Sequence, residues 1–393
     1  MKNDQRIDPQ AVLYISGFSD IVGGGQLSFL LLLKHLDRSR FRPVVLCPGE
    51  GEVSRVVSGM GIETSFLERP APGFRRWRRL PAYVAELCRV ITKSGARLVH
   101  CDTLDSALLA GAAARFLRVP LVFHARVADG GGVLDRLIPF FCSRIICVSG
   151  AAAERFEGAC CSKGKVRVIH NGVDLEAFSP LGRGEAFRRK YKIPAHSPLL
   201  GYCGQLVEGK GPAVLIDAFK IIKGLVPGAV LALAGRGTYE PELRRKVREY
   251  GLEDSVIFAG FVEDTPEFMS ALDVFAFPSA FREGFSRVLL EAMAAGKPVI
   301  AAPLGGNIET IAEGETGLFF QAGSASDLAR KAVSLLKDGA LAARLGGNGR
   351  GRAERFFDIR GTAEKIHRVY EELMPGPVRA APGLSDPAGK DKT

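Results

Sequence analysis

The sequence lacks the marks of several protein classes. It has a single tryptophan in 393 residues, and its eight cysteines include no Cys-x-x-Cys pair, which argues against a zinc ribbon. The longest apolar run, residues 27–33, is too short to cross a bilayer, and the polar first ten residues hold no hydrophobic core of a secretion signal. We therefore expect reduced cysteines and a cytoplasmic protein.

Acidic residues are fewer than basic residues only in the first half of the chain. Residues 1–190 hold 28 Lys and Arg against 18 Asp and Glu, whereas the remaining residues are balanced at 25 each. An excess confined to one half predicts an anionic surface or substrate facing that half. A solvated basic face is the alternative interpretation.

The hydrophobic pattern indicates two successive α/β series. Short apolar runs alternate with amphipathic segments, which is typical of parallel sheets with helical crossovers. The runs lie at 11–16, 43–47, 97–101, 120–125, 144–149 and 166–170, and then at 199–206, 229–235, 256–261, 274–279, 298–302 and 316–320. Two Rossmann-like domains would place the carboxyl ends of their strands at a shared cleft, where open α/β sheets bind ligands.

A polar segment with Pro and Gly, residues 175–195, separates the two series. We expect an N-terminal acceptor-side domain over 1–178 and a C-terminal nucleotide-sugar domain over 179–358. A helix over 359–375 should pack back toward the first domain. The tail 376–393 is rich in Pro, Gly and Ala, and it is expected to be disordered.

The strongest motif is REGFSRVLLEAMAAGKPVI at 282–300, with Glu283 and Glu291 eight residues apart. The pattern predicts a helix from about Gly284 to Gly296. Eight residues of helix would separate the two carboxylates by about 12 Å, on the order of the span from a sugar to a ribose across a diphosphate. The amides at the helix N-terminus suit the diphosphate between them.

This stretch resembles the Glu-x7-Glu motif of retaining glycosyltransferase family 4, and the resemblance extends over residues 11–375. It implies the GT-B fold, in which two Rossmann-like domains face each other across a cleft. It further implies that Glu283 binds donor-sugar hydroxyls and Glu291 the ribose. The amides of Phe285 and Ser286 would meet the diphosphate.

A second motif, GYCGQLVEGKG at 201–211, combines a strand end with a glycine-containing loop and a lysine. Lys210 can neutralise phosphate charge there, and it matches the family's phosphate-binding lysine. The family has arginine where this chain has Gln205, which can donate a hydrogen bond but carries no charge. Either phosphate binding is weaker here or another cation helps, with Arg282 and Arg287 as candidates.

Two further segments resemble family sites at strand ends. The turn containing Gly23, Gly24 and Gly25 is similar to the loop that contacts the diphosphate and acceptor. Glycines there let a backbone approach a ligand closely. His124 ends a strand; a lone histidine is more often structural, but the resemblance implies a role near the donor sugar.

The remaining expected contacts concern the nucleotide. Gly235, in AGRGTYEPEL, should lie near the nucleotide, and Phe261 and Val262 follow a strand where the family holds the base largely through backbone. Ser149 is expected to cap a helix. Glu309 would lie near the sugar or diphosphate, with a structural role as the alternative.

The segment 69–93 surrounds the only tryptophan with arginines beside an amphipathic helix. This composition suits an anionic membrane surface. It could also grip nucleic acid, but no nucleic-acid-binding motif accompanies it, and an ordinary surface helix is the remaining alternative.

The combined prediction is a retaining hexosyltransferase that uses a UDP- or GDP-linked donor, with Glu283, His124 and Lys210 as the catalytic residues. The acceptor would be a sugar or lipid-linked hydroxyl in polysaccharide, lipopolysaccharide or glycolipid synthesis, and the enzyme would be peripheral on the inner membrane face. No Asp-x-Asp motif occurs, so no metal is expected, and the donor is a co-substrate rather than a cofactor.

Other functions remain open at this stage. An epimerase, a phosphorylase or a non-catalytic sugar-nucleotide-binding protein could share the fold. A glycoside hydrolase is disfavoured, because its paired carboxyls lie about 5–9.5 Å apart. A dinucleotide oxidoreductase is also disfavoured, because such an enzyme needs a Gly-x-Gly-x-x-Gly after the first strand and this sequence lacks it.

Overall fold

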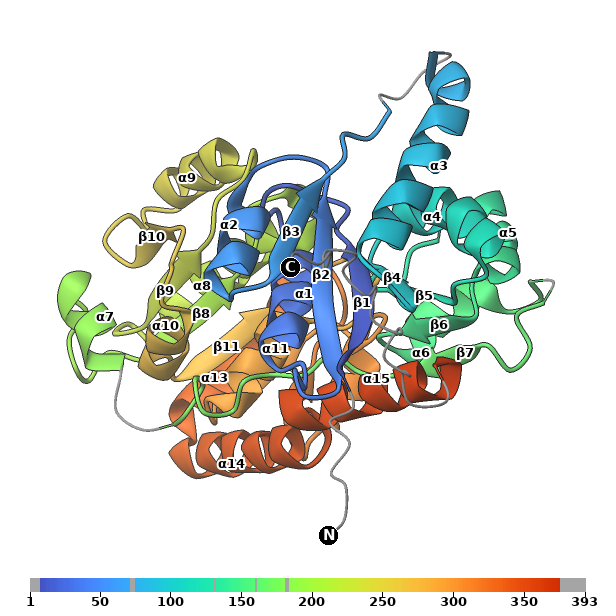
Figure 1. Cartoon of the computed structure of the whole chain (residues 1–393). Coiled ribbons are helices and arrows are strands. Elements are labelled where there is room, and N and C mark those ends of the chain that lie inside the picture. Colours follow the sequence, from blue (N-terminus) through green and yellow to red (C-terminus); the bar gives the residue numbers. More distant parts are fainter. Residues whose placement is uncertain (1–7, 71–74, 131, 160, 181–183, 375–393) are drawn as a thin grey trace, which may run out of the picture.

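The computed structural model describes residues 8–70, 75–130, 132–159, 161–180 and 184–374, without the side chains of 75–78. It consists of two lobes, each a parallel sheet with helices on its faces (Figure 1). The expected pair of Rossmann-like domains is therefore confirmed. The tail predicted over 376–393 lies outside the described residues.

The first lobe is a seven-stranded sheet in the order β3-β2-β1-β4-β5-β6-β7. Its strands are β1 (Gln10–Ile15), β2 (Phe41–Cys47), β3 (Glu63–Phe66), β4 (Leu98–Cys101), β5 (Leu121–Ala125), β6 (Arg144–Cys147) and β7 (Val166–Val168). Its helices are α1 (Gly24–Lys34), α2 (Glu52–Gly59), α3 (Arg75–Lys93), α4 (Leu104–Leu117), α5 (Val133–Phe141) and α6 (Gly150–Ala153), followed by the 3-10 turn η1 (Glu154–Phe156). The edge strand β3 was not anticipated, because its half-exposed residues show no apolar run.

The second lobe is a six-stranded sheet in the order β10-β9-β8-β11-β12-β13. Its strands are β8 (Leu199–Cys203), β9 (Val230–Ala234), β10 (Val256–Gly260), β11 (Val274–Phe277), β12 (Val299–Ala301) and β13 (Leu318–Phe319). Its helical elements are α7 (Gly184–Lys190), the 3-10 turn η2 (Glu208–Lys210), α8 (Pro212–Leu225), α9 (Glu240–Glu249), α10 (Thr265–Ala271), α11 (Arg287–Ala294), α12 (Asn307–Thr310), α13 (Ala325–Lys337) and α14 (Gly339–Phe356).

Burial on both faces explains the near-continuous apolar strands. Every residue of β11 is buried, and four of the five residues of β8 are buried. Helices cover both faces of a parallel sheet, so a strand there needs apolar side chains at successive positions. This is why the strands could be located from short apolar runs.

The strand order reverses once in each sheet, between β1 and β4 in the first lobe and between β8 and β11 in the second. Loops diverge at such a switch point and leave a crevice outside the carboxyl ends of the strands. The glycine turn follows β1, and the two strongest sequence motifs follow β8 and β11. All three therefore lie at switch points.

Helix α15 (Ile359–Leu373) returns from the second lobe to the first and runs beneath it in Figure 1. The hydroxyl of Tyr370 lies 2.7 Å from Nδ1 of His100 on β4, and Val173 pairs with Asp358 where the chain crosses between the lobes. Helix α14 was not anticipated, because it holds several glycines. One reason for them is close packing: a Cβ on Gly346 would lie 2.1 Å from the carbonyl oxygen of Gly296.

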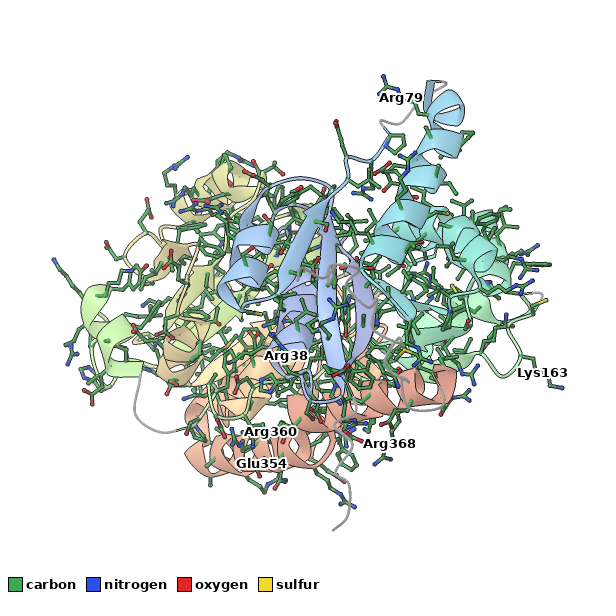
Figure 2. All side chains as sticks on the ribbon, viewed as in Figure 1. Arg38, Arg79, Lys163, Glu354, Arg360 and Arg368 are labelled. Carbon is green, nitrogen blue, oxygen red and sulfur yellow. The ribbon has the colours of Figure 1, made fainter. Side chains whose placement is uncertain are left out.

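The outer surface carries most of the charged side chains. Figure 2 shows Arg79 at the tip of α3 and Lys163 before β7, both pointing away from the first lobe. Among the described helices, none combines the length and the apolar character that crossing a membrane requires.

Candidate active site

The two residues singled out most strongly by the sequence, Lys210 and Glu283, form one ion pair. Lysine Nζ lies 2.6 Å from Oε1 of Glu283, and the same oxygen accepts a 2.6 Å hydrogen bond from Ser279 Oγ. Lys210 is on η2 after β8, and Glu283 is in the loop after β11. Both side chains are mostly covered, at 22% and 15% exposed, so water screens the pair only partly.

The helix expected from about Gly284 begins later than predicted. Helix α11 starts at Arg287, so Glu283 lies in the preceding loop, and the spacing of about 12 Å worked out for a continuous helix does not describe this pair. The reason is a close backbone contact. The amide of Gly306 donates to the Glu283 carbonyl at 2.9 Å, and a Cβ on Gly306 would lie 2.1 Å from the Gly284 carbonyl oxygen.

Glu291 is buried and accepts a 2.5 Å hydrogen bond from Arg287 one turn earlier. It borders a hollow of about 40 Å³ between α1, the chain crossing and α11. The ribose contact predicted for Glu291 stays a prediction.

The two residues just before α11 offer unpaired amides. Within the described residues, no acceptor lies in hydrogen-bonding position for the amides of Phe285 and Ser286. The Phe285 carbonyl accepts from Asn171 at 3.1 Å, and its ring stacks on His170 at 4.7 Å. These contacts hold the loop while its amides stay available to an anion, as helix N-termini commonly provide.

The glycine turn of the first lobe faces these residues. Gln205 Nε2 donates to the Val22 carbonyl at 2.8 Å, which joins the two lobes. The turn is shorter than expected, because α1 begins at Gly24 and Gly23 is its N-cap. A Cβ on Gly24 would lie 3.7 Å from Arg287 Cδ, so the start of α1 lies against α11.

His124 is buried within β5, and its ring lies 5.4 Å from that of His100. Neither ring nitrogen has a hydrogen-bond partner in the described part of the chain. Burial, together with the nearby charge of Arg126, lowers the His124 pKa well below its ordinary value, so the ring is neutral. The role of His124 near the donor sugar stays a prediction.

Arg126, two residues after His124, was missed. Its Nε and Nη2 are covered and have no acceptor among the described residues, and burial lowers its pKa to about 10. A Cβ on Gly25 would lie 3.7 Å from Arg126 Cδ, and one on Gly284 would lie 2.2 Å from the Arg126 carbonyl oxygen. Nothing in the local sequence distinguishes this arginine from the many others in the first half.

The expected nucleotide contacts are placed as follows. Gly235 has a φ of 142°, and a Cβ there would lie 1.8 Å from the Gly204 carbonyl oxygen, so glycine is needed for packing between the loops after β8 and β9. Phe261, after β10, is 64% exposed, and Val262 packs partly against the core. Their contact with a base stays a prediction.

Glu309 connects the two lobes, and its expected place near the sugar or diphosphate stays a prediction. Its carboxylate accepts from the amides of Gly150 and Ala151 at 3.0 and 3.3 Å and lies 2.9 Å from His170 Nε2. It therefore ties the second lobe to the start of α6. Ser149 caps that helix through the Ala152 amide, as expected.

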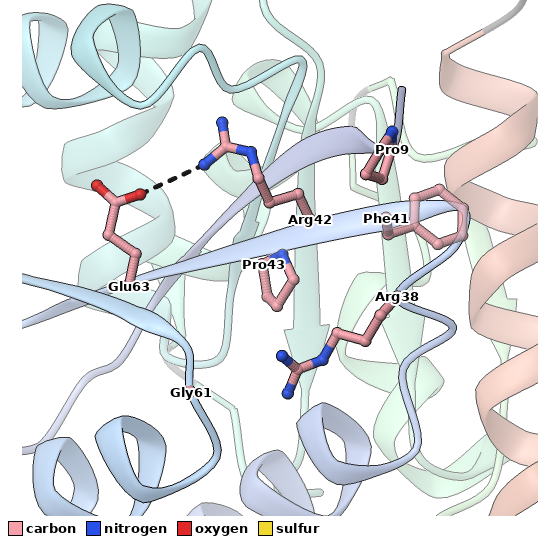
Figure 3. A pocket seen from close by; sticks show the side chains of 7 residues that line it. All are labelled: Pro9, Arg38, Phe41, Arg42, Pro43, Gly61 and Glu63. Atoms are coloured by element: carbon pink, nitrogen blue, oxygen red, sulfur yellow. Dashed lines mark hydrogen bonds and ion pairs between the residues drawn. The ribbon is translucent and has the colours of Figure 1, made fainter. Parts of the chain in front are cut away.

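A larger hollow, of about 270 Å³, lies elsewhere (Figure 3). It borders Phe41, Arg42 and Pro43 at the beginning of β2, with an ion pair between Arg42 and Glu63 at 3.3 Å. This is the amino end of the sheet, opposite the end that holds the glycine turn. The candidate active site is the place where the glycine turn and the loops after β8 and β11 meet at the switch points, and not this hollow.

Comparison with known families decides the class. Residues 22–177 match the family described as Glycosyltransferase Family 4, and residues 184–352 match Glycosyl transferases group 1. The chain belongs to glycosyltransferase family 4. It is a glycosyltransferase, and the resemblance inferred from its motifs is confirmed.

Similar proteins agree with this family. EpsD of Bacillus subtilis is 28% identical over 310 residues, which cover 75% of this chain and 81% of EpsD. The lipopolysaccharide core biosynthesis mannosyltransferase LpsB of Rhizobium meliloti is 31% identical over 214 residues, covering 53% of this chain. That match spans 61% of LpsB, less than two thirds of the relative.

Solved structures show the same fold. Anabaena HepE in complex with UDP-glucose has a TM-score of 0.81 and 25% identity over 92% of this glycosyltransferase and 99% of HepE. The outer core galactosyltransferase WaaB has a TM-score of 0.72 and 17% identity over 92% of this chain and all of WaaB. The predicted GT-B architecture is therefore confirmed.

Proposed function

We propose that this glycosyltransferase moves a hexosyl-type group from a nucleotide-diphosphate sugar to an acceptor hydroxyl with retention of anomeric configuration. The observation that carries the proposal is the Lys210–Glu283 pair at the switch point of the second lobe, beside the unpaired amides of Phe285 and Ser286. A cation and free amides stabilise the charge that develops on a departing diphosphate. The carboxylate beside them suits the hydroxyls of the sugar.

The proposed reaction uses this placement. The bond between the anomeric carbon and the phosphate oxygen breaks, and the acceptor oxygen bonds to the same face of that carbon. The acceptor proton passes to the departing phosphate oxygen. Because the acceptor attacks the face from which the phosphate leaves, the anomeric configuration is unchanged. Glu283 orients the sugar and forms no covalent intermediate, and neutral His124 can donate one hydrogen bond to a sugar hydroxyl.

The relatives support the donor class. HepE has been solved in complex with UDP-glucose, and a similar protein of Mycobacterium tuberculosis is a GDP-mannose-dependent phosphatidylinositol monomannoside mannosyltransferase. We therefore assign a UDP- or GDP-linked donor, and an acceptor in polysaccharide, lipopolysaccharide or glycolipid synthesis. No resident cofactor or metal has a part in the proposed step.

Thermal shift with UDP, GDP and their sugar conjugates tests donor binding. One nucleotide class should raise the melting temperature of the wild type and raise that of Lys210→Ala less. Lys163→Ala, which removes an equal charge from the outer surface, is the matched control and should respond like the wild type. Equal shifts in Lys210→Ala and wild type would contradict the phosphate role.

Turnover separates the enzyme from a non-catalytic binder. With the donor class so identified, proton NMR of the product should show the donor's anomeric configuration. An inverted product would contradict the retaining mechanism. Diphosphate binding without any transfer or donor hydrolysis would favour the non-catalytic alternative, and dependence on free phosphate would favour a phosphorylase.

An anionic membrane is the proposed partner of the first lobe. On α5, Leu137 and Phe140 are 45% and 53% exposed, and Phe116 near the end of neighbouring α4 is 80% exposed. Helix α3, which packs on α4, extends away from the body with Arg79 at its tip (Figures 1 and 2). The remaining basic cluster around Trp77 falls on side chains outside the description. Exposed apolar and basic groups together favour an anionic lipid surface.

Vesicle flotation tests this partner. The protein should float with vesicles containing anionic lipid and not with neutral vesicles, and Leu137→Ser with Phe140→Ser should reduce flotation. Leu225→Ser, an exposed apolar residue of the second lobe, is the control. Absence of flotation with anionic vesicles would remove the membrane from the account.

A further inference from the structure

Arg126 stands out among the cations of the cleft, because two of its N–H groups are buried and unpaired. Nε and Nη2 are covered by protein and have no acceptor within the described residues, although the side chain as a whole keeps some exposure. A covered guanidinium with unsatisfied donors costs free energy that an anion would recover. These two N–H groups can therefore gain hydrogen bonds from an anion.

Arg126 lies next to the starts of two helices, one from each lobe. Its Cδ is next to Gly25 in the first turn of α1, and its carbonyl is next to Gly284 in the loop before α11. Both helices begin here, so their N-terminal amides and partial positive charges point toward the same region. An anion between the lobes would meet the guanidinium and the start of α11 together.

Two other arginines of the second lobe already form ion pairs. Arg287 is bound to Glu291 at 2.5 Å and Arg282 to Glu154 at 2.7 Å. The two arginines considered from sequence as replacements for the missing family arginine are thus paired with carboxylates.

The carboxylate of Asp102, which acts on Arg126 through space, does not pair with its two covered N–H groups. Asp102 accepts from the Gly17 amide at 3.0 Å, and burial raises its pKa above the ordinary value. Its charge favours the arginine through space, but Nε and Nη2 still lack an acceptor. Their hydrogen-bonding capacity is left for a group that enters from the cleft.

We propose that Arg126 binds the sugar-side phosphate of the donor and supplies, from the first lobe, the positive charge that Gln205 lacks in the second. The inference rests on the proposed donor class, a nucleoside diphosphate sugar. The guanidinium would place two parallel N–H donors on one phosphate, a geometry that arginine fits better than lysine. Gln205 meanwhile holds the glycine turn through Val22.

The test is calorimetric binding of the nucleoside diphosphate that stabilises the wild type, with the matching nucleoside as reference. Arg126→Met keeps the length of the side chain and removes its charge, and it should weaken diphosphate binding by about 10–100-fold, as the loss of a charge-assisted hydrogen bond predicts. Nucleoside binding should not change. Arg126→Lys should recover part of the loss.

A rescue variant separates this role from a structural one. Adding Gln205→Arg to Arg126→Met should restore much of the diphosphate affinity, because it returns a cation to the position of the family arginine. A packing defect at Arg126 would not be rescued from the other lobe. The melting temperature of ligand-free Arg126→Met should stay level or rise, since an unpaired buried charge is removed.

The outcomes are distinct. If the wild type binds a diphosphate and Arg126→Met binds it equally well, the inference fails while the proposed function stands. If Arg126→Met keeps its donor affinity but raises KM for the acceptor, the arginine serves an anionic acceptor and the inference is also overturned. If the wild type binds no nucleoside diphosphate, the proposed function itself fails.

Discussion

Replacing Lys210 by methionine should lower the transfer rate much more than it lowers the free energy of unfolding. The change removes the ammonium that lies 2.6 Å from Glu283 and keeps the length of the side chain. Glu283 would retain its hydrogen bond from Ser279 but lose its counter-charge. Breaking a fully buried pair costs about 3–5 kcal/mol and breaking an exposed pair about 0–1 kcal/mol. With side chains 22% and 15% exposed, we expect a loss near 1–2 kcal/mol.

The effect on transfer should be larger. Lys210 faces the position of the departing diphosphate, where loss of one preorganised stabilising group costs about 2.7–4 kcal/mol, or 100- to 1,000-fold in kcat. The assay is the initial rate of transfer at saturating donor, together with urea unfolding of the same preparations. Lys163→Met is the control and should match the wild type in both measurements.

The double variant Lys210→Met with Glu283→Gln tests the coupling. Removing both charges leaves no unpaired carboxylate, so the double variant should lose less stability than the sum of the two single losses. Its transfer rate should lie within a few fold of the rate of the slower single variant. Strictly additive losses in both stability and rate would refute the reasoning, because they would show that the two groups act independently.

Two further perturbations follow from the same contacts. Gly284→Ala would place a Cβ 2.2 Å from the Arg126 carbonyl oxygen, so it should hold the two lobes apart. We expect kcat to fall at least tenfold, with little loss of secondary structure by circular dichroism. An unchanged kcat would rule out this contact between the lobes during turnover. Burial lowers the pKa of His100 to about 3 and that of His124 well below its ordinary value, whereas both take up protons near pH 6.5 when unfolded. The free energy of unfolding should therefore not depend on these histidines above about pH 6.5, and it should fall by about 1.4 kcal/mol per histidine for each pH unit below that value. The measurement is urea unfolding at several pH values, and an equally steep fall in His100→Phe and wild type would contradict this expectation.

Much of the fold could be predicted from the sequence, because parallel strands covered on both faces need continuous apolar residues. The run that contains Val274 to Phe277 is an example, and all four residues are buried. The edge strand β3 escaped prediction for the opposite reason, since its residues are half-exposed and polar. Helix α14 escaped because its glycines serve contacts with other elements, such as that of Gly346 with Gly296.

The candidate site was predicted residue by residue but not in its connections. Lys210 and Glu283 came from separate motifs, and only the fold shows that they share one ion pair. The start of α11 was misplaced, because the loop at Gly284 is held by a backbone contact with a distant glycine pair. Arg126 could not be found at all, since an unpaired guanidinium is a property of the surroundings and not of the local sequence.

The most direct test is an experimental structure of the chain with bound UDP or GDP, whichever stabilises it. The account predicts that the terminal phosphate lies within about 3 Å of Lys210 Nζ and of the amides of Phe285 and Ser286. A nucleotide seated in the hollow at the beginning of β2, or phosphates far from the loop before α11, would contradict it.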